Sequence, residues 1–500
     1  MSYKNGKYYF PSWAWILIYL ITWIVIDQLL IPTKWNAGRL WLTRVALLTL
    51  TTILFTKNRY AFITLWNQTG SGFNLAIWRI LFFGSFLFTS FFFSIEHIKI
   101  ALFSMTEMPD SARVPLPFWG SLTYMIPVNM NLSLISFYTL LISCFFAFIG
   151  FKTRWSILLF TLSGFYLFGV SQLFGKVNHN HYFVWFPAIL AFSGCGDVLS
   201  IDSWLRTKSK KSMLELHSNK NYGRAFAATW LLVSIIYFFP AFQKIWENGL
   251  DWMFTDNLSN IINQKLLELP EWKQILQVQK YPTLCKFLAT LTVLFEFSFI
   301  FIILKPKHRW KALAAGALFH IGTWLTMDIF FQFMIISYLS FINWEKLFFK
   351  NTSLVYFNEQ IKVSKSLNGI AIFLIVMNSY CGFLNIHSWP LSCFPTFSSM
   401  PGNTTEILEF IDLTKTKIQS VITHEQFHKI FPPERFRNLE LKAIKLYKEN
   451  KAEELKNLIT SLTKKLSLKN SLQVYLVKIT WQDGKTLRKR EPTPILELDL

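Results

Sequence analysis

The sequence predicts an all-α polytopic membrane protein with about 9 to 11 membrane segments and a small C-terminal extracytoplasmic α+β domain. Hydrophobic residues make up 52% of the 500-residue chain and charged residues only 16%, whereas soluble proteins carry about a quarter charged residues. The apolar residues also gather in blocks of about 17 to 22, which is long enough for a helix to cross a bilayer. A net charge of +21 would suit a nucleic-acid-binding protein, but membrane topology explains it more simply, so no nucleic-acid partner is expected.

About eleven apolar blocks can be recognised along the chain. We expect the first block to remain as a membrane span, because only a short polar stretch precedes it and no small-residue cleavage site follows it. The ninth and tenth blocks are short and could form one broken or re-entrant unit, which would move the tail to the other side of the membrane. The blocks are 13–31, 40–56, 75–95, 132–151, 155–175, 181–200, 225–243, 285–304, 311–327, 329–343 and 368–387.

The distribution of lysine and arginine predicts the orientation. If the N-terminus is cytoplasmic, the cytoplasmic side collects basic residues within 4–7, 57–59, 152–154, 206–224, 305–311 and 346–365. The opposite short loops hold little more than Lys34, Arg39 and Lys176. This bias is what the positive-inside rule requires. Phe- and Lys-rich usage with few glycines favours a bacterial inner membrane, and the loops 96–131 and 244–284 are expected on its outer side.

Three regions follow from this topology: membrane helices in 1–70, a transmembrane domain in 71–387 and a C-terminal tail in 388–500. The tail is rich in Lys and Glu and is expected outside the cytoplasm. Its patterns predict amphipathic helices at 433–449 and 452–466, and alternating residues at 406–413 and 472–481 predict strands. We therefore expect a small α+β domain of about 100 residues.

The cysteines show no metal-ligand spacing, and no metal is expected. Cys144 and Cys195 lie in apolar blocks and are interpreted as packing residues. Cys285, Cys381 and Cys393 fall near the outer face, where one disulfide among them could form in an oxidising compartment.

Two titratable groups are predicted at similar depth near the outer face. Lys244 follows the block 225–243, which runs outward, and His181 begins the block 181–200 at the same face. A lysine in a partly apolar pocket can act as a base near neutral pH, because desolvation disfavours the ammonium form. A histidine beside it can accept or donate a proton. The alternative is that Lys244 reaches to lipid headgroups and His181 caps a helix.

Three further ionisable residues lie deeper in the predicted bilayer. Glu296 and His320 occupy the middle of their blocks, and Arg79 lies about one turn inside its own. An unpaired carboxylate at this depth is costly, so Glu296 should be neutral or paired, with Arg79 or His320 as its partner. We interpret these three residues as a structural polar network between helices.

Five short strings, in one order along the chain, resemble the membrane domain of vitamin K-dependent γ-glutamyl carboxylases and their bacterial relatives, the HTTM family. The resemblance covers about residues 70 to 345. The strings are Trp78-Arg79-Ile80-Leu81-Phe82, Asn180-His181-Tyr182, Ala241-Phe242-Gln243-Lys244-Ile245 with Asp251-Trp252, Leu294-Phe295-Glu296 and Phe319-His320.

The resemblance implies a specific chemistry. A lysine matched by Lys244 is the catalytic base that starts oxygenation of reduced vitamin K (menaquinol or a similar hydroquinone) by O2, and the histidine matched by His181 assists it. The epoxidation generates a strong base that removes a proton from a protein glutamate, to which CO2 then adds. Asn180, Tyr182 and Trp252 would lie in the quinone pocket. The implied partners are membrane lipid, the quinone and an extracytoplasmic peptide or protein substrate.

Two departures from the family leave the carboxylation half of the reaction open. Only about 110 residues follow the last predicted span, and nothing in them resembles the lumenal region with which animal enzymes grip their substrate. Asn248 and Gly249 also lengthen the spacing between Lys244 and Trp252. Two alternatives remain: a proton-coupled transporter or lipid-handling protein in which Glu296, His320 and Arg79 form a proton or substrate path, and a non-catalytic membrane scaffold.

Overall fold

The computed structural model describes most of the chain, and its described part is mainly helical. Seven helices are long and apolar enough to cross a membrane, so the predicted fold class is confirmed. They are α2 (Asn36–Asn67), α3 (Gly72–Phe92), α6 (Met130–Ile149), α7 (Thr153–Gln172), α10 (Lys220–Asn248), α13 (Pro282–Ile303) and α17 (Lys365–Phe383). Residues outside the description are 1, 5–6, 10–11, 31–35, 93–105, 107, 115, 119–121, 123–125, 176–179, 208–215, 270, 330, 350–355, 359–362, 393, 395–396, 414–418, 465, 467–470, 483–484 and 499–500.

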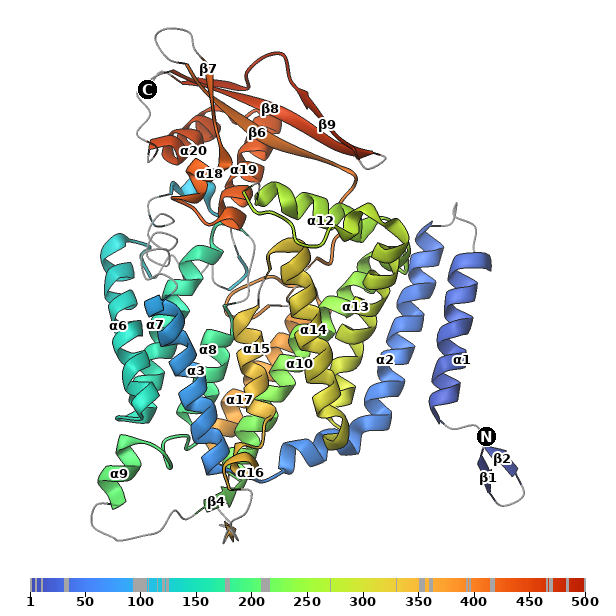
Figure 1. The fold of residues 1–500 in the computed structure, drawn as a ribbon, viewed down its shortest axis with the longest axis vertical. Helices are drawn as coiled ribbons and strands as arrows, with labels where there is room; N and C mark the ends of the chain where they lie inside the picture. The colour runs from blue at the N-terminus through green and yellow to red at the C-terminus, as the bar shows by residue number, and fades with distance from the viewer. Residues whose placement is uncertain are drawn as a thin grey trace.

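Further helices occupy the remaining predicted blocks. They are α1 (Ser12–Val25) with the π-helical turn η1 (Ile26–Leu30), α8 (Tyr182–Ala191), α14 (Arg309–Met327), and α15 (Gln332–Tyr338) with the 3-10 turn η6 (Leu339–Phe341). The block 181–200 is helical only as far as Ala191, since a glycine-containing loop with Gly194 at φ +79° follows. The ninth and tenth blocks form two separate helices, and the N-terminus and the C-terminal domain lie at opposite ends of the bundle (Figure 1).

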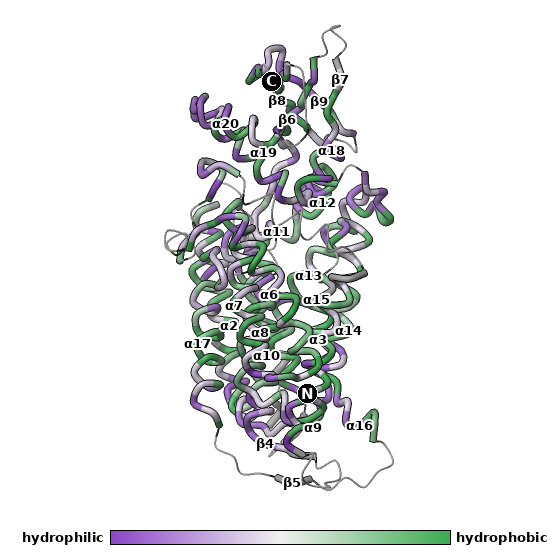
Figure 2. Tube along the Cα trace, turned by 90° about the vertical axis from the view of Figure 1, so that its left-hand side faces the viewer, coloured by the Kyte–Doolittle hydropathy of each residue, from purple (hydrophilic) through white to green (hydrophobic). Residues whose placement is uncertain are grey.

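Helix α10 lies at the centre of the bundle. It packs against α2, α13 and α17, and its apolar window is entirely buried. At Gly382 the backbone of α17 comes so close to the ring of Phe239 on α10 that a Cβ atom would overlap the ring. Hydrophobic residues concentrate along the bundle, while hydrophilic residues gather at its ends and over the C-terminal domain (Figure 2).

Short elements close the two ends of the bundle. The end nearer the N-terminus carries α9 (Ile201–Thr207), η5 (Pro306–His308), α16 (Trp344–Phe348) and a small sheet of β3 (Gly70–Ser71), β4 (Leu216–Asn219) and β5 (Tyr356–Asn358). The other end carries η3 (Asp110–Ala112), α11 (Asp251–Phe254), α12 (Asn257–Glu268) and η4 (Val278–Lys280). The N-terminal strands β1 (Ser2–Lys4) and β2 (Lys7–Tyr9) form a hairpin.

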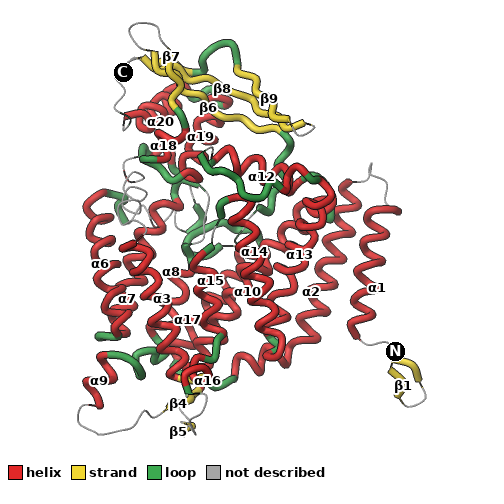
Figure 3. Tube along the Cα trace, viewed as in Figure 1, coloured by secondary structure: helices red, strands yellow, loops and turns green. Residues whose placement is uncertain are grey.

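The C-terminal domain (404–498) is an antiparallel half-barrel sheet with helices against it (Figure 3). The sheet order is β10–β8–β6–β7, and β9 pairs with the free side of part of β8. The predicted helices and strands correspond to α19, α20, β6 and β8, which are confirmed. The elements are β6 (Thr404–Leu413), β7 (Gln419–Ile422), α18 (His424–His428), α19 (Pro433–Lys448), α20 (Ala452–Lys464), β8 (Ser471–Gln482), β9 (Lys485–Arg490) and β10 (Leu496–Leu498).

Side-chain contacts hold this domain on the bundle. The Nδ1 atom of His428 lies 3.3 Å from Oε2 of Glu271, and Nη1 of Arg435 donates to the carbonyl of Gly175 at 3.2 Å. The segment before β6 also inserts into the end of the bundle. Its Trp389 is fully buried and donates Nε1–H to the carbonyl of Phe165 at 2.8 Å. The first part of the predicted tail therefore packs as part of the membrane domain.

Candidate functional site

An internal cavity lies in the half of the bundle that faces the C-terminal domain. Its volume is about 80 Å³, measured as the space open to the centre of a water molecule. The walls come from α8, α10, α13, α14 and α15, and residues of α11, α12 and the segment before β6 complete the lining. The polar residues on the cavity include Lys244, Glu296, Tyr237 and His320, among mainly aromatic and aliphatic neighbours.

An ion pair forms one polar group of this cavity. The Nζ atom of Lys244 donates to Oε2 of Glu296 at 2.5 Å, and the two residues are only 2% and 4% exposed. Nζ also lies 4.9 Å from the ring centroid of Trp252. The prediction that Arg79 or His320 is the partner of Glu296 is wrong. Lys244 is not at the surface, because α10 continues to Asn248 and α11 covers its end.

A second polar group lies on the same cavity. The hydroxyl of Tyr237 is 2.6 Å from Nε2 of His320 and also hydrogen-bonds to the hydroxyl of Tyr338. All three side chains are buried, and Nδ1 of His320 has no hydrogen-bond partner among the described residues. Neither tyrosine is among the site residues predicted from the sequence. Tyr237 could have been found, because it lies seven residues before Lys244 and so on the same helix face; no comparable signal marks Tyr338.

The predicted neighbour of Lys244 lies elsewhere. His181 is fully buried, its Nε2 is 3.2 Å from the carbonyl of Ser388, and its ring contacts Phe394 at a centroid distance of 4.7 Å. Phe394 lines the cavity, whereas His181 does not. The histidine therefore lies behind an aromatic wall. Its ring also contacts Trp389 at 4.8 Å, so the insertion of the segment before β6 determines its surroundings.

The three predicted pocket residues divide between the cavity and its surroundings. Tyr182 and Trp252 line the cavity, and both are buried. Trp252 is held by a hydrogen bond from Nε1 to the carbonyl of Phe397 at 2.9 Å. Asn180, which precedes α8, is not part of the lining.

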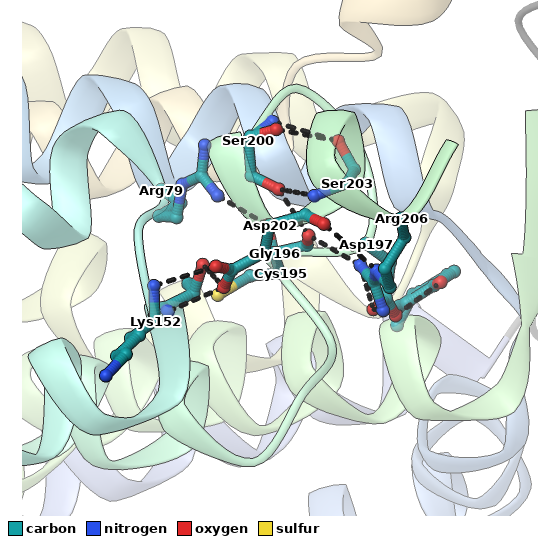
Figure 4. A network of polar contacts seen from close by, with 11 residues as sticks. Arg79, Lys152, Cys195, Gly196, Asp197, Ser200, Asp202, Ser203 and Arg206 are labelled. Atoms are coloured by element: carbon teal, nitrogen blue, oxygen red, sulfur yellow. Dashed lines mark hydrogen bonds and ion pairs between the residues drawn. The ribbon is translucent and has the colours of Figure 1, made fainter. Parts of the chain in front are cut away.

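Arg79 belongs to a different polar cluster, near the end of the bundle that carries α9 (Figure 4). Its Nη1 and Nη2 atoms donate to the carbonyls of Cys195 and Leu199 at 3.1 and 2.5 Å. Close by, the carboxylate of Asp202 accepts from the backbone N–H groups of Lys152 and Thr153 at 2.7 Å each. These contacts tie the loop after α8 to α3 and α7. Arg79 thus has a structural role, separate from Glu296 and His320.

The described cysteines form no disulfide. Cys144, Cys195, Cys285 and Cys381 are free and buried, so a bond between Cys285 and Cys381 is excluded in this structure. Cys393, the third cysteine predicted near the outer face, lies outside the described residues.

Comparison of the chain with models of protein families, with curated proteins and with solved structures finds no match. The candidate site therefore rests on the geometry of the cavity and on the residues that line it.

Proposed function

We propose that this protein is an integral membrane enzyme that oxygenates a reduced quinone, with Lys244 as the base. The observation that carries the proposal is the burial of the Lys244–Glu296 pair on an otherwise aromatic and aliphatic cavity. A buried amine on such a cavity can accept a proton from a hydroxyl group, and flat apolar walls suit an aromatic ring. The resemblance to the vitamin K-dependent carboxylases supports the same assignment of Lys244.

The lining fits a hydroquinone ring after a local adjustment. A cavity of about 150 Å³ takes benzene, so the 80 Å³ cavity admits a ring only when lining side chains move. Met327 and Met334 both line it, and methionine is unbranched and adapts its shape readily. A hydroquinone bound in the cavity would react with O2 to give the quinone epoxide and water.

Glu296 can accept the proton that Lys244 must release before Lys244 can act as a base. Two opposite charges are costly to bury, and the pair keeps zero net charge whether it exists as ammonium and carboxylate or as amine and carboxylic acid. Transfer of one proton from Nζ to Oε2 over the 2.5 Å contact frees the amine. Tyr237 and His320 supply further hydrogen-bonding groups on the cavity, which can orient a second hydroxyl of the substrate.

Carboxylation of a protein glutamate with CO2 is the second half of the proposed chemistry. The cavity lies beneath α12 and the segment before β6, both on the side of the C-terminal domain. With the N-terminus in the cytoplasm of a bacterium, this side of the inner membrane faces outward. An extracytoplasmic peptide or protein would then reach the cavity from the C-terminal domain.

One observation favours a second candidate function. Glu296 and His320, two of the three residues predicted for proton-coupled transport, lie on the same cavity as Lys244, whereas the third, Arg79, does not line it. A proton-coupled transporter or a lipid-handling protein could use these groups to couple protonation to substrate binding. A scaffold without activity would instead tolerate replacement of both Lys244 and His181.

Conversion of reduced vitamin K to its epoxide by the purified protein in detergent, with O2 present, tests the proposal. We expect turnover by the wild type and a loss of about 10² to 10⁴-fold in Lys244→Ala, the range typical of a catalytic base. Lys286→Ala is the matched control, because Lys286 lies on α13 with a side chain 42% exposed. No turnover by folded wild-type protein would overturn the enzyme proposal and favour transport.

A further inference from the structure

A long apolar groove lies between α1 and α13, alongside α2. Its volume is about 590 Å³, and its walls come from α1, α2 and α13, with the ends of α10 and α11. We call it the α1–α13 groove. Leu20 and Trp23 of α1 line one side, and Val293, Leu294 and Phe297 of α13 line the other. It is distinct from the cavity of Lys244, which lies on a different face of α13.

The length of the groove suits one hydrocarbon chain. On α13 the lining runs from Thr290 to Ile302, which corresponds to about 18 Å at 1.5 Å per residue. One leaflet of a bilayer has a hydrocarbon thickness of about 15 Å, half of the whole core. A single acyl chain in one leaflet can therefore follow the groove over most of its length.

Two lysines and a histidine mark one end of the groove. Lys305 and His308 belong to the turn between α13 and α14, and Lys311 lies in the first turn of α14; all three line the groove and are exposed. Among the residues that the structure describes, none of the three has a carboxylate within 4 Å. Lys307 lies in the same turn and is equally exposed, but it is not part of the lining. The basic end therefore combines side chains that have no carboxylate partner among the described residues with an apolar channel.

We propose that the α1–α13 groove binds an anionic phospholipid, with the phosphate at Lys305, His308 and Lys311 and an acyl chain between α1 and α13. Lysines bind phosphate as point charges, and basic pockets between membrane helices bind anionic headgroups. A quinone has no charged headgroup and would leave the basic end unused. The proposed lipid also links α1 to α13 across the groove, whereas α2 already packs against α10.

Lipid binding to the delipidated full-length protein, measured by native mass spectrometry, tests this proposal. The probes are phosphatidylglycerol and phosphatidylcholine with identical acyl chains. We expect the wild type to bind phosphatidylglycerol more tightly, and Lys305→Gln/Lys311→Gln to lose this preference by roughly fivefold per lysine. Lys307→Gln should keep it. Leu294→Trp, at an exposed position of the groove wall, should weaken both lipids.

Several results would overturn the proposal. Equal binding of both lipids by the wild type would remove the role of the headgroup. If Lys307→Gln lowered the preference for phosphatidylglycerol as much as the double variant does, general surface charge would explain the preference without the groove. If the protein retains menaquinone, and neither Lys305→Gln/Lys311→Gln nor Lys307→Gln changes this retention, the groove binds a neutral isoprenoid chain instead. A dimer that excludes lipid would assign it to a second copy of the protein.

Discussion

The Nζ atom of Lys244 lies 2.5 Å from Oε2 of Glu296, and the two residues are 52 positions apart on α10 and α13. Both helices are apolar along most of their length, and the pair lies where they face each other near the C-terminal domain. Burying two charges costs solvation energy that their attraction offsets only when the geometry is good. Burial of such a pair is therefore weak evidence for a role in stability, and the proton-transfer role remains our proposal.

Removal of one partner should destabilise the protein more than removal of both. Glu296→Ala leaves the ammonium of Lys244 buried without its partner, and we expect the unfolding free energy to fall by about 3 to 5 kcal/mol. Lys244→Met/Glu296→Leu should be less destabilised than either single variant, as measured by thermal unfolding in detergent. Asp256→Ala, which removes the exposed partner of Lys286, is the control and should cost at most about 1 kcal/mol. Additive single effects in the double variant would contradict the pairing.

Two glycines of α14 should respond differently to alanine. A Cβ atom at Gly316 would overlap the hydroxyl of Tyr338, whereas a Cβ at Gly322 meets nothing within 4 Å. Gly316→Ala should therefore displace Tyr338 from Tyr237 and lower the unfolding free energy by about 1 to 3 kcal/mol, the cost of an unsatisfied buried polar group. Gly322→Ala should leave stability unchanged or raise it by up to about 1 kcal/mol through helix propensity. Equal thermal midpoints for the two variants would argue against this arrangement.

The acid dependence of stability should report on Asp202, which lies outside the membrane-spanning helices. Burial acts to raise the pKa of Asp202, but hydrogen bonds from Thr153 and Lys152 outweigh it, and the pKa lies below its ordinary value. A lowered pKa in the folded state adds stability that is complete above the unfolded pKa and is lost as the pH falls through the folded one. The difference between wild type and Asp202→Asn should therefore be about 1 kcal/mol at neutral pH and shrink below about pH 4.

Unfolding of both proteins between neutral pH and pH 3 measures this difference. Asp110→Asn is the control, because the side chain of Asp110 is 87% exposed, and its effect should be small at every pH. A wild-type advantage that grows as the pH falls would show that the sign of the Asp202 contribution is wrong.

Cysteine labelling should determine the orientation in the membrane. Asn457 of α20 and Lys307 of η5 are exposed and lie at opposite ends of the structure. In a Cys393→Ser background, a membrane-impermeant maleimide should label Asn457→Cys on intact bacterial cells and Lys307→Cys only after permeabilisation. The four free cysteines are buried and should not react. Labelling in the reverse order would place the C-terminal domain in the cytoplasm.

Local patterns in the sequence predicted much of the fold. The helix predicted at 433–449 is α19, because a helix with one apolar face shows its period in the sequence. The strand predicted at 472–481 is β8 for the equivalent reason, since alternate residues face the core. The block 181–200 failed as a full helix because α8 ends at Ala191, where Gly194 and the contacts of Arg79 hold a loop instead.

The sequence by itself determined which segments are apolar enough for a membrane and which charged residues lie within them, because both depend on residues close together in the chain. Only the tertiary structure decided the partners. It joined Lys244 to Glu296, brought Tyr237 to His320, and placed His181 behind Phe394. Such contacts depend on which sides of the helices touch and on the relative height of the helices in the bundle. These are properties of the packed bundle, and hydrophobic periodicity carries no information about them.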